Sequence, residues 1–206
     1  MEQEILCTID DSIEIKKALK SIAPDIARAV NLIMKSLRQG GKVVVFGNGG
    51  SAADSQHFAA ELVGRFECER EPIPCIALTA NTSNLTAIAN DYDFSSVFMK
   101  QVQALVCSGD TAIGISTSGN SKNVFLALKA AGEKGAATIA MTGAQGGIAG
   151  EVSDLCLCAP SSRTCRIQEC HGIIIHILCE QVEKLMMKEA AAESRTDIIP
   201  AGGTKP

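Results

Sequence analysis

The sequence predicts an α/β protein in which a five-stranded parallel sheet lies between two layers of helices, a three-layer α/β/α sandwich. Three observations predict this class. Short apolar runs, such as residues 42–46 (KVVVF), are typical of strands buried on both faces of a parallel sheet. Five such runs alternate with segments of helical periodicity. Turns rich in glycine or serine follow two of the strands, where open sheets of this class bind ligands.

The expected elements follow one another in chain order. Apolar residues at three-to-four spacing predict an N-terminal helical hairpin over residues 10–38, with a second helix that begins near Pro24. The expected strands cover residues 42–46, 73–79, 111–116, 136–142 and 154–159. The expected helices between and after them cover residues 52–64, 83–90, 94–106 and 122–133, a short segment before the last strand, and residues 163–189. Residues 1–190 then form one domain, and the aperiodic tail 191–206 is expected to be disordered.

Composition excludes several classes of protein. The 206 residues are 46% hydrophobic and 20% charged, as in globular domains. The net charge of −4 and an aromatic content of 3% argue against nucleic-acid binding along the chain. The N-terminus is acidic, unlike a signal peptide, and no apolar run reaches the roughly 18 residues that span a bilayer. We therefore expect a cytoplasmic protein without nucleic-acid or membrane partners, whose nine cysteines are buried reduced thiols.

The first loop of interest is GNGGSA at residues 47–52, between a strand and a helix. It matches the pattern G-x-G-x-x-[GA], but a dinucleotide site needs an acidic residue at the end of the next strand. That strand ends in Thr79, Ala80 and Asn81. The sequence therefore favours a loop that lets another ligand approach the backbone, with a simple tight turn as the alternative.

The second loop, residues 116–121 (STSGNS), places four hydroxyl groups at the start of a helix. Free backbone N–H groups and the positive end of the helix dipole lie there, which favours an anion such as phosphate. A helix cap alone would need only one hydroxyl. The loop therefore predicts a phosphate site without lysine or arginine.

The three histidines lie on two of the predicted helices. His57 and Glu61, four residues apart, share one face of the helix that begins in the glycine loop. His171 and His176 lie on the last helix, and His176 stands among isoleucines, where a buried structural histidine is the alternative. Neither pattern decides the function by itself.

Four segments together resemble the sedoheptulose 7-phosphate isomerase (phosphoheptose isomerase) family of the sugar isomerase (SIS) domain superfamily. They are VVVFGNGGSAADSQHFAAELVGRF, LTAIANDYDF, GISTSGNSKNV and RIQECHGIIIHILCEQVE, and the likeness runs from about residue 10 to 188. The resemblance implies a SIS-domain fold with a flavodoxin-like strand order. It also implies an aldose–ketose isomerase that converts D-sedoheptulose 7-phosphate to D-glycero-D-manno-heptose 7-phosphate for bacterial surface polysaccharides. A homotetramer with sites at subunit interfaces and one zinc ion per subunit are further implications.

The resemblance assigns roles residue by residue. The catalytic pair matches Glu61 and His176, and the metal ligands match His57, Glu61, Gln168 and His176. The positions that match substrate contacts are Asn48, Gly49, Gly50, Ser51, Glu61, Arg65, Asn90, Asp91, Ser116, Thr117, Ser118, Ser121 and Gln168. The alternative is a DnaA initiator-associating regulatory protein of the same superfamily, which is not an enzyme and which resembles residues 80–91 closely. That family lacks the carboxylate and the imidazole that match Glu61 and His176, so the sequence favours the enzyme.

The chemistry of these residues suits proton transfer between C1 and C2 of a sugar. Glu61 suits the base, and His176, whose ordinary pKa lies near neutral pH, suits the acid at the oxygens. A zinc ion could polarise the carbonyl, and the order of the two roles of Glu61, base and ligand, stays open. Gln168 and His176 are eight residues apart, about 12 Å of rise on one helix. Either Gln168 precedes the regular helix, or the two residues serve one site from different subunits.

Overall fold

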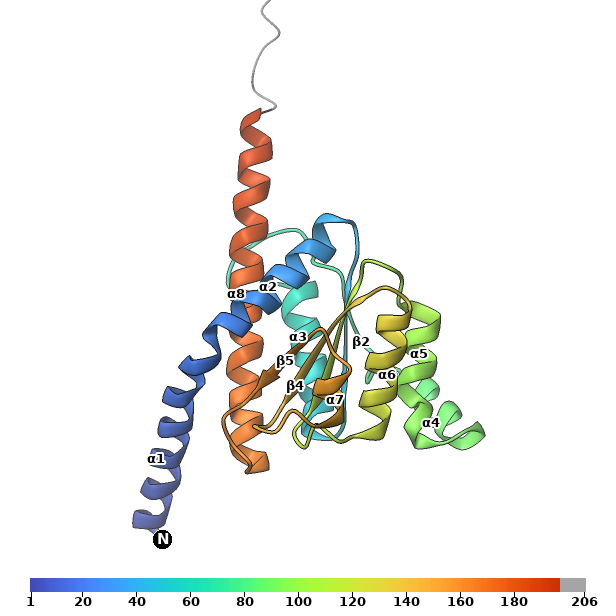
Figure 1. Cartoon of the computed structure of the whole chain (residues 1–206). Coiled ribbons are helices and arrows are strands. Elements are labelled where there is room, and N and C mark those ends of the chain that lie inside the picture. Colours follow the sequence, from blue (N-terminus) through green and yellow to red (C-terminus); the bar gives the residue numbers. More distant parts are fainter. Residues whose placement is uncertain (197–206) are drawn as a thin grey trace, which may run out of the picture.

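Five parallel strands form the centre of the computed structural model, which describes residues 1–196 (Figure 1). They are β1 (Val43–Gly47), β2 (Cys75–Ala77), β3 (Thr111–Ser116), β4 (Ala137–Thr142) and β5 (Leu155–Cys158). Their order in the sheet is β2-β1-β3-β4-β5, the flavodoxin-like order, and every neighbouring pair is parallel. Each position of β1 and β3 is buried, as the apolar runs predicted.

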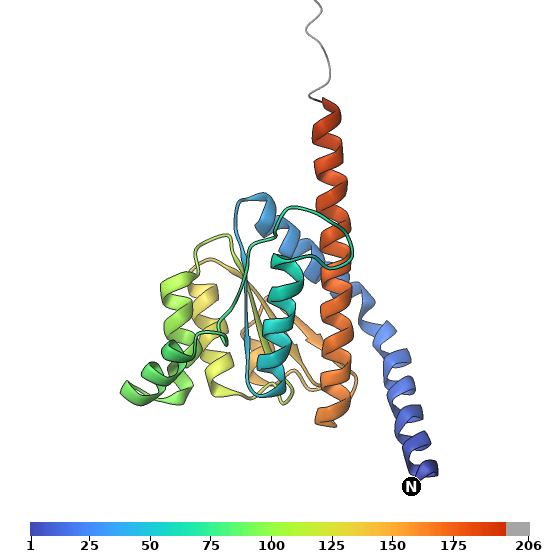
Figure 2. The ribbon, with the colours of Figure 1, turned by 180° about the vertical axis from the view of Figure 1, so that it is seen from behind.

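Helices cover both faces of the sheet, which confirms the predicted three-layer architecture (Figures 1 and 2). One face packs against α2 (Ala23–Arg38), α3 (Gly50–Val63) and α8 (Thr164–Thr196). The other packs against α5 (Val97–Leu105) and α6 (Lys122–Glu133). Alternate side chains of β1 enter the two cores, Val43 and Val45 on the first face and Val44 and Phe46 on the second. Three further elements are the helices α4 (Thr82–Asp91) and α7 (Gly147–Glu151) and the 3₁₀ turn η2 (Phe94–Ser96).

The N-terminal helices form one bent run, and the expectation of a hairpin is wrong. Helix α1 (Glu2–Ala18) continues through the 3₁₀ turn η1 (Leu19–Ile22) into α2 (Figure 1). The chain does not reverse because Ala18 and Ala23 keep right-handed helical backbone angles. Pro24 lies in the first turn of α2, where its missing N–H is tolerated. The helix also begins earlier than residue 10, with acidic residues in the first turn of α1 that suit the helix dipole.

Three further expectations need correction. Helix α8 continues through Thr196, so the disorder expected from residue 191 is wrong for residues 191–196. Three consecutive alanines at 190–192 favour this extension. The rest of the predicted tail, 197–206, lies outside the described residues. Strand β2 is shorter than predicted, since Pro74, at the start of the expected run, has no N–H to give to a ladder.

The third correction concerns the cysteines. Four of them, Cys7, Cys68, Cys107 and Cys165, are exposed rather than buried. Cys156 and Cys158 lie on one face of β5, and their sulfur atoms are 3.4 Å apart. In the part of the chain that the structure describes, no helix is both long enough and apolar enough to cross a membrane.

Candidate functional site

The two loops singled out in the sequence follow neighbouring strands. The glycine loop leaves β1 and the hydroxyl loop leaves β3, and these strands pair directly in the sheet. Because the chain leaves β1 toward β2 on one side and β3 lies on the other, this edge is the topological switch point where such sheets bind ligands. Asn48 and Asn123 join the loops through two reciprocal amide hydrogen bonds of 2.9 Å. Asn123, which is buried at the start of α6, was not among the predicted site residues.

The glycine loop allows the close approach that its sequence indicated. Gly49 has φ +56°, a conformation that side chains with a Cβ rarely adopt. Gly50 begins α3, and a Cβ on it would overlap the amide nitrogen of Gln168 from α8. Ser51 is buried below the loop. The structure therefore brings Gln168 against Gly50, at the N-terminal end of α3.

The hydroxyl loop gathers its side chains as predicted. Ser116 Oγ donates to Ser121 Oγ at 2.9 Å and lies 3.5 Å from Ser118 Oγ. Ser118 Oγ also accepts the backbone N–H of Asn120. The hydroxyl groups of the three serines thus form one cluster at the N-terminus of α6, a place that suits an anion.

A cavity of about 250 Å³ opens beside this cluster. Three loops at the carboxyl edge of the sheet and the first turn of α8 line it, with residues Thr117, Ser118, Asn120, Gly143, Ala144, Gln145, Ser161, Ser162 and Ile167. Ser161 and Ser162 were missed in the sequence. Their signal was available, because they follow the last predicted strand and therefore reach the same edge as the other loops.

Three titratable side chains meet between α3 and α8. His57 Nε2 lies 2.9 Å from Glu61 Oε1. The rings of His57 and His176 meet edge to face with centroids 5.1 Å apart. The ring of Phe66 packs against His176 at 5.7 Å. Asp54, one turn before His57, has a buried carboxylate oxygen without a hydrogen-bond partner, and burial raises its pKa although His57 opposes this. Sequence reasoning missed Asp54 and Phe66.

Gln168 and His176 lie at two different levels of the same helix pair. Helices α3 and α8 run parallel and side by side (Figures 1 and 2), so Gln168 meets Gly50 while His176 meets His57. Because α8 begins at Thr164, Gln168 is inside the regular helix. The alternative that it precedes the helix is therefore wrong. Within residues 1–196, no three His, Cys, Asp or Glu side chains are close enough to hold one metal ion.

The remaining predicted contacts lie apart from this cluster. Arg65 is exposed and forms a loose pair with Glu69 at 3.9 Å. Asn90 and Asp91 end α4, where the Asn90 amide donates to the Asp91 carboxylate at 2.9 Å. Helix α4 projects from the side of the molecule opposite α8 (Figures 1 and 2). Within a single chain, Asn90 and Asp91 therefore do not lie beside His57 and His176.

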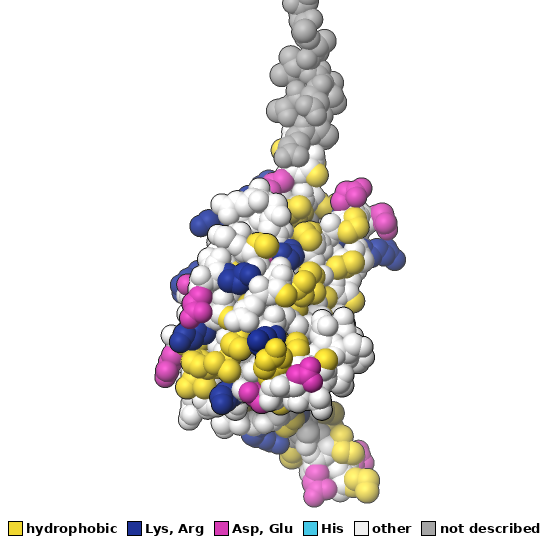
Figure 3. Space-filling model, turned by 90° about the vertical axis from the view of Figure 1, so that its right-hand side faces the viewer, with side chains coloured by type: hydrophobic (Ala, Val, Ile, Leu, Met, Phe, Trp, Pro, Cys, Tyr) yellow, Lys and Arg dark blue, Asp and Glu magenta, His cyan; other side chains and the backbone are white. Residues whose placement is uncertain are grey.

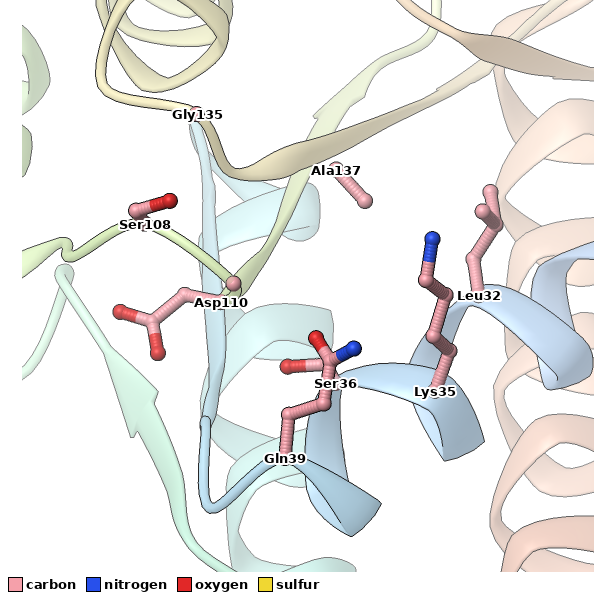
Figure 4. A pocket seen from close by; sticks show the side chains of 9 residues that line it. Leu32, Lys35, Ser36, Gln39, Ser108, Asp110, Gly135 and Ala137 are labelled. Atoms are coloured by element: carbon pink, nitrogen blue, oxygen red, sulfur yellow. The ribbon is translucent and has the colours of Figure 1, made fainter.

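Another cavity, of about 230 Å³, lies at the amino ends of the strands (Figure 4). Its carboxylate, Asp110, accepts the backbone N–H groups of Lys42 and Cys107 and pairs with Lys42 Nζ at 2.6 Å. Burial opposes the charge of Asp110, but Lys42 and the backbone donors hold its pKa below the usual range. The Asp110 carboxylate links the residues that precede β1 and β3. It lies at the amino ends of the strands, whereas the switch-point site lies at their carboxyl ends.

Comparisons with known proteins agree on one family. The SIS domain family model matches residues 9–143. The phosphoheptose isomerase of Aquifex aeolicus is 51% identical over 181 residues, which cover 87% of this chain and 95% of that protein. The phosphoheptose isomerase of Aromatoleum aromaticum is 53% identical over 182 residues, 86% of this chain and 92% of that protein. The chain belongs to the phosphoheptose isomerase family.

A solved structure of the family supports this on the level of the fold. The phosphoheptose isomerase of Neisseria gonorrhoeae superimposes with a TM-score of 0.84 at 42% identity, over 89% of this chain and 98% of that one. The resemblance in the four sequence segments is thereby confirmed. As a member of the phosphoheptose isomerase family, this chain offers a carboxylate and two imidazoles in one cluster. They lie on the helix pair that borders the glycine loop, and the hydroxyl loop lies next to that loop.

Proposed function

We propose that the chain catalyses the isomerisation of D-sedoheptulose 7-phosphate to D-glycero-D-manno-heptose 7-phosphate, a step toward activated heptose for bacterial surface polysaccharide. The observation that carries the proposal is the contact of Glu61, His57 and His176, in a chain about half identical to phosphoheptose isomerases. A carboxylate beside imidazoles is the equipment that proton transfer next to a carbonyl needs.

The chemistry moves a proton from C1 to C2 through an enediol. Glu61 takes the proton from one carbon and returns it to the other, and His176 moves protons at the two sugar oxygens. The hydroxyl loop holds the phosphate, remote from the reacting carbons, so that its binding energy keeps the open-chain sugar in place during the step. The two asparagines that join the loops keep the phosphate end and the sugar end of the site at a fixed separation.

We also propose one zinc ion per subunit, bound by His57, Glu61, Gln168 and His176. A mixed set of nitrogen and oxygen donors suits zinc, and His57 contacts both Glu61 and the ring of His176. As the structure describes them, these three side chains are not close enough to hold one ion, so zinc binding would draw them together. A bound zinc ion would supply polarisation of the carbonyl and stabilisation of the enediolate. Gln168 lies eight residues, about 12 Å of rise, before His176 on α8 and contacts Gly50 instead, so we infer that the fourth donor comes from a neighbouring subunit.

The proposed assembly is a homotetramer with sites at the subunit interfaces. Helix α1 buries no side chain, and Ile5, Ile9 and Ile13 form an exposed stripe along it. Helix α4 also buries none, and Tyr92 and Phe94, just after it, are about 60% exposed. Figure 3, which faces the α4 side of the molecule, shows hydrophobic side chains gathered there. A neighbouring subunit on these surfaces could add Gln168 or the end of α4 to the histidine cluster. The proposed enzyme acts on sugar phosphates in the cytoplasm.

The decisive experiment is incubation with sedoheptulose 7-phosphate, followed by NMR for the aldose. The wild-type protein should form it and, in D₂O, should place deuterium on the carbon next to the carbonyl. Glu61→Gln should keep the fold and lower turnover by roughly 10²–10⁴-fold, the scale of a lost general base. A wild-type protein that binds the replication initiator and never isomerises the sugar would refute the proposal.

A further inference from the structure

A buried ion pair joins helix α8 to the segment that follows α3, and neither of its residues belongs to the site described above. Arg70 Nε lies 3.0 Å from Glu183 Oε1, and their side chains are 5% and 3% exposed. The two residues are 113 positions apart in the sequence and join the segment after α3 to α8. Because a buried ion pair must offset a large desolvation cost, it has to be supported by further hydrogen bonds.

The Glu183 carboxylate has such support from the backbone of the segment after α3. Its Oε1 accepts the N–H of Phe66 at 3.1 Å, and its Oε2 accepts those of Glu67 and Cys68 at 2.9 and 3.0 Å. Burial alone would raise the pKa of Glu183, but these donors and Arg70 lower it. Three successive N–H groups are therefore fixed to one carboxylate on α8.

Arg70 does the same for the carboxyl end of α3. Its terminal nitrogens donate to the carbonyls of Glu61 and Leu62, both at 2.9 Å, and to Gly64 at 3.3 Å. These are carbonyls at the end of a helix, which have no partner within the helix itself. A cation there also suits the negative end of the helix dipole. Arg70 thus holds the helical turn that carries Glu61.

Phe66 links this network to the imidazoles. Its backbone N–H donates to Glu183, and its ring packs against His176. His176 lies on α8, two turns before Glu183. His176 in turn meets His57, which contacts Glu61. One carboxylate therefore fixes the ring that borders His176, and its ion-pair partner fixes the turn that bears Glu61.

We propose that Phe66, Arg70 and Glu183 are positioning residues that hold the His176 imidazole and the Glu61 carboxylate in their mutual orientation. This inference rests on the proposed isomerase function for its kinetic consequence. None of the three residues is among those that we assign to the sugar or the phosphate, so loss of the network should lower kcat and leave KM nearly unchanged. Small misplacements of catalytic groups of this kind cost up to about 10²-fold in rate.

The first test compares Phe66→Leu with Phe66→Tyr in the full-length protein. Leucine keeps an apolar side chain but removes the ring, so kcat should fall roughly tenfold or more with KM within about twofold. Tyrosine keeps the ring and should restore most of kcat. The imidazole NMR signals of His176 should shift in Phe66→Leu and stay near their wild-type positions in Phe66→Tyr, since a ring at this distance shields them.

The second test compares Glu183→Gln with Glu189→Gln. Glu189 also lies on α8 and also pairs with an arginine, Arg38, but on the surface. Only Glu183→Gln should speed hydrogen exchange at the amides of residues 66–68 and lower kcat, because an amide cannot satisfy all these donors. If Glu183→Gln does not fold, the Phe66 pair decides. Unchanged kcat and unchanged His176 signals in Phe66→Leu would overturn the inference. A wild-type protein without isomerase activity would refute the proposed function instead, and the imidazole signals would then decide the inference alone.

Discussion

Replacing Gly50 with alanine should separate the function of the site from the stability of the fold. Gly50 is the first residue of α3, and its φ is not positive, so alanine fits the backbone. The new Cβ would overlap the Gln168 amide nitrogen and lie 3.0 Å from its Cδ. Both are at the far end of a flexible side chain. The helix can therefore keep its place while the Gln168 amide moves.

The magnitudes follow from these contacts. A glycine-to-alanine change at a compatible position stabilises a protein by about 0.4–1 kcal/mol. For a chain of this size that raises Tm by roughly 1–4 °C. Gln168 matches a substrate contact of the family, and loss of one such hydrogen bond from its displaced amide would cost about 0.5–1.5 kcal/mol, equivalent to roughly a 2- to 13-fold loss in kcat/KM. The variant should therefore be as stable as the wild type or more so, and less active.

Gly49→Ala is the matched control one residue earlier. At Gly49 a Cβ has no neighbour within 4 Å, but φ is +56° and ψ is −120°. Strain of this kind costs about 1–3 kcal/mol, which lowers Tm by roughly 2–12 °C. Calorimetry at one fixed protein concentration and the NMR isomerase assay measure both effects. A Gly50→Ala variant with full kcat/KM would show that the Gln168 amide does not act in the reaction. A destabilised Gly50→Ala beside an unaffected Gly49→Ala would refute the backbone argument.

Further predictions concern the buried histidine, the hydroxyl loop, the metal and the assembly. Burial lowers the pKa of His171 to about 4. Between pH 6.5 and about 4 the unfolded chain binds a proton that the folded chain does not, so the free energy of unfolding decreases as pH falls through this range. Urea unfolding should show a decrease of roughly 2 kcal/mol between pH 7 and pH 5. This decrease should be absent in His171→Leu. Ser118→Ala combined with Ser121→Ala should raise KM, since each hydrogen bond to a charged group is worth about 1.5–3 kcal/mol, and an unchanged KM would move the phosphate elsewhere. His57→Ala should lower the zinc content by elemental analysis without unfolding the protein, and full activity in metal-free wild type would remove zinc from the mechanism. Mixing Glu61→Gln with Gln168→Ala subunits, each of low activity alone, should restore some activity because the proposed site takes Gln168 from a neighbouring subunit, and verified exchange without recovery would place both groups in one chain's site.

The loops could be predicted from the sequence because their signals are local. Glycine at 49 and the hydroxyls of 116–121 act through the backbone next to them, so their roles depend little on distant residues. The N-terminal bend is different. Pro24 is compatible both with a helix after a reversal and with a helix that continues, and only the backbone angles of residues 18–23 distinguish them.

The partners of the site could not be predicted, because they are brought together by packing. Nothing in the sequence states the register of α3 against α8, which decides that Gln168 meets Gly50 while His176 meets His57. Phe66 follows the predicted helix in an aperiodic segment, and its contact with His176 depends on that register. The ion pair of Arg70 with Glu183 joins charges 113 residues apart, and neither residue has a local pattern that marks burial.

The position of α8 at the end of the described chain has a consequence during synthesis. Its residues Ile174, Ile175 and Leu178 complete the core on the sheet face that α2 and α3 also cover. Until the ribosome has made this helix of 33 residues, about 2–7 s at ordinary rates, the apolar face beside α3 has no cover. A nascent chain with such a face is prone to aggregate. The same helix that brings His176 to His57 therefore also ends the interval in which the unfinished chain needs protection.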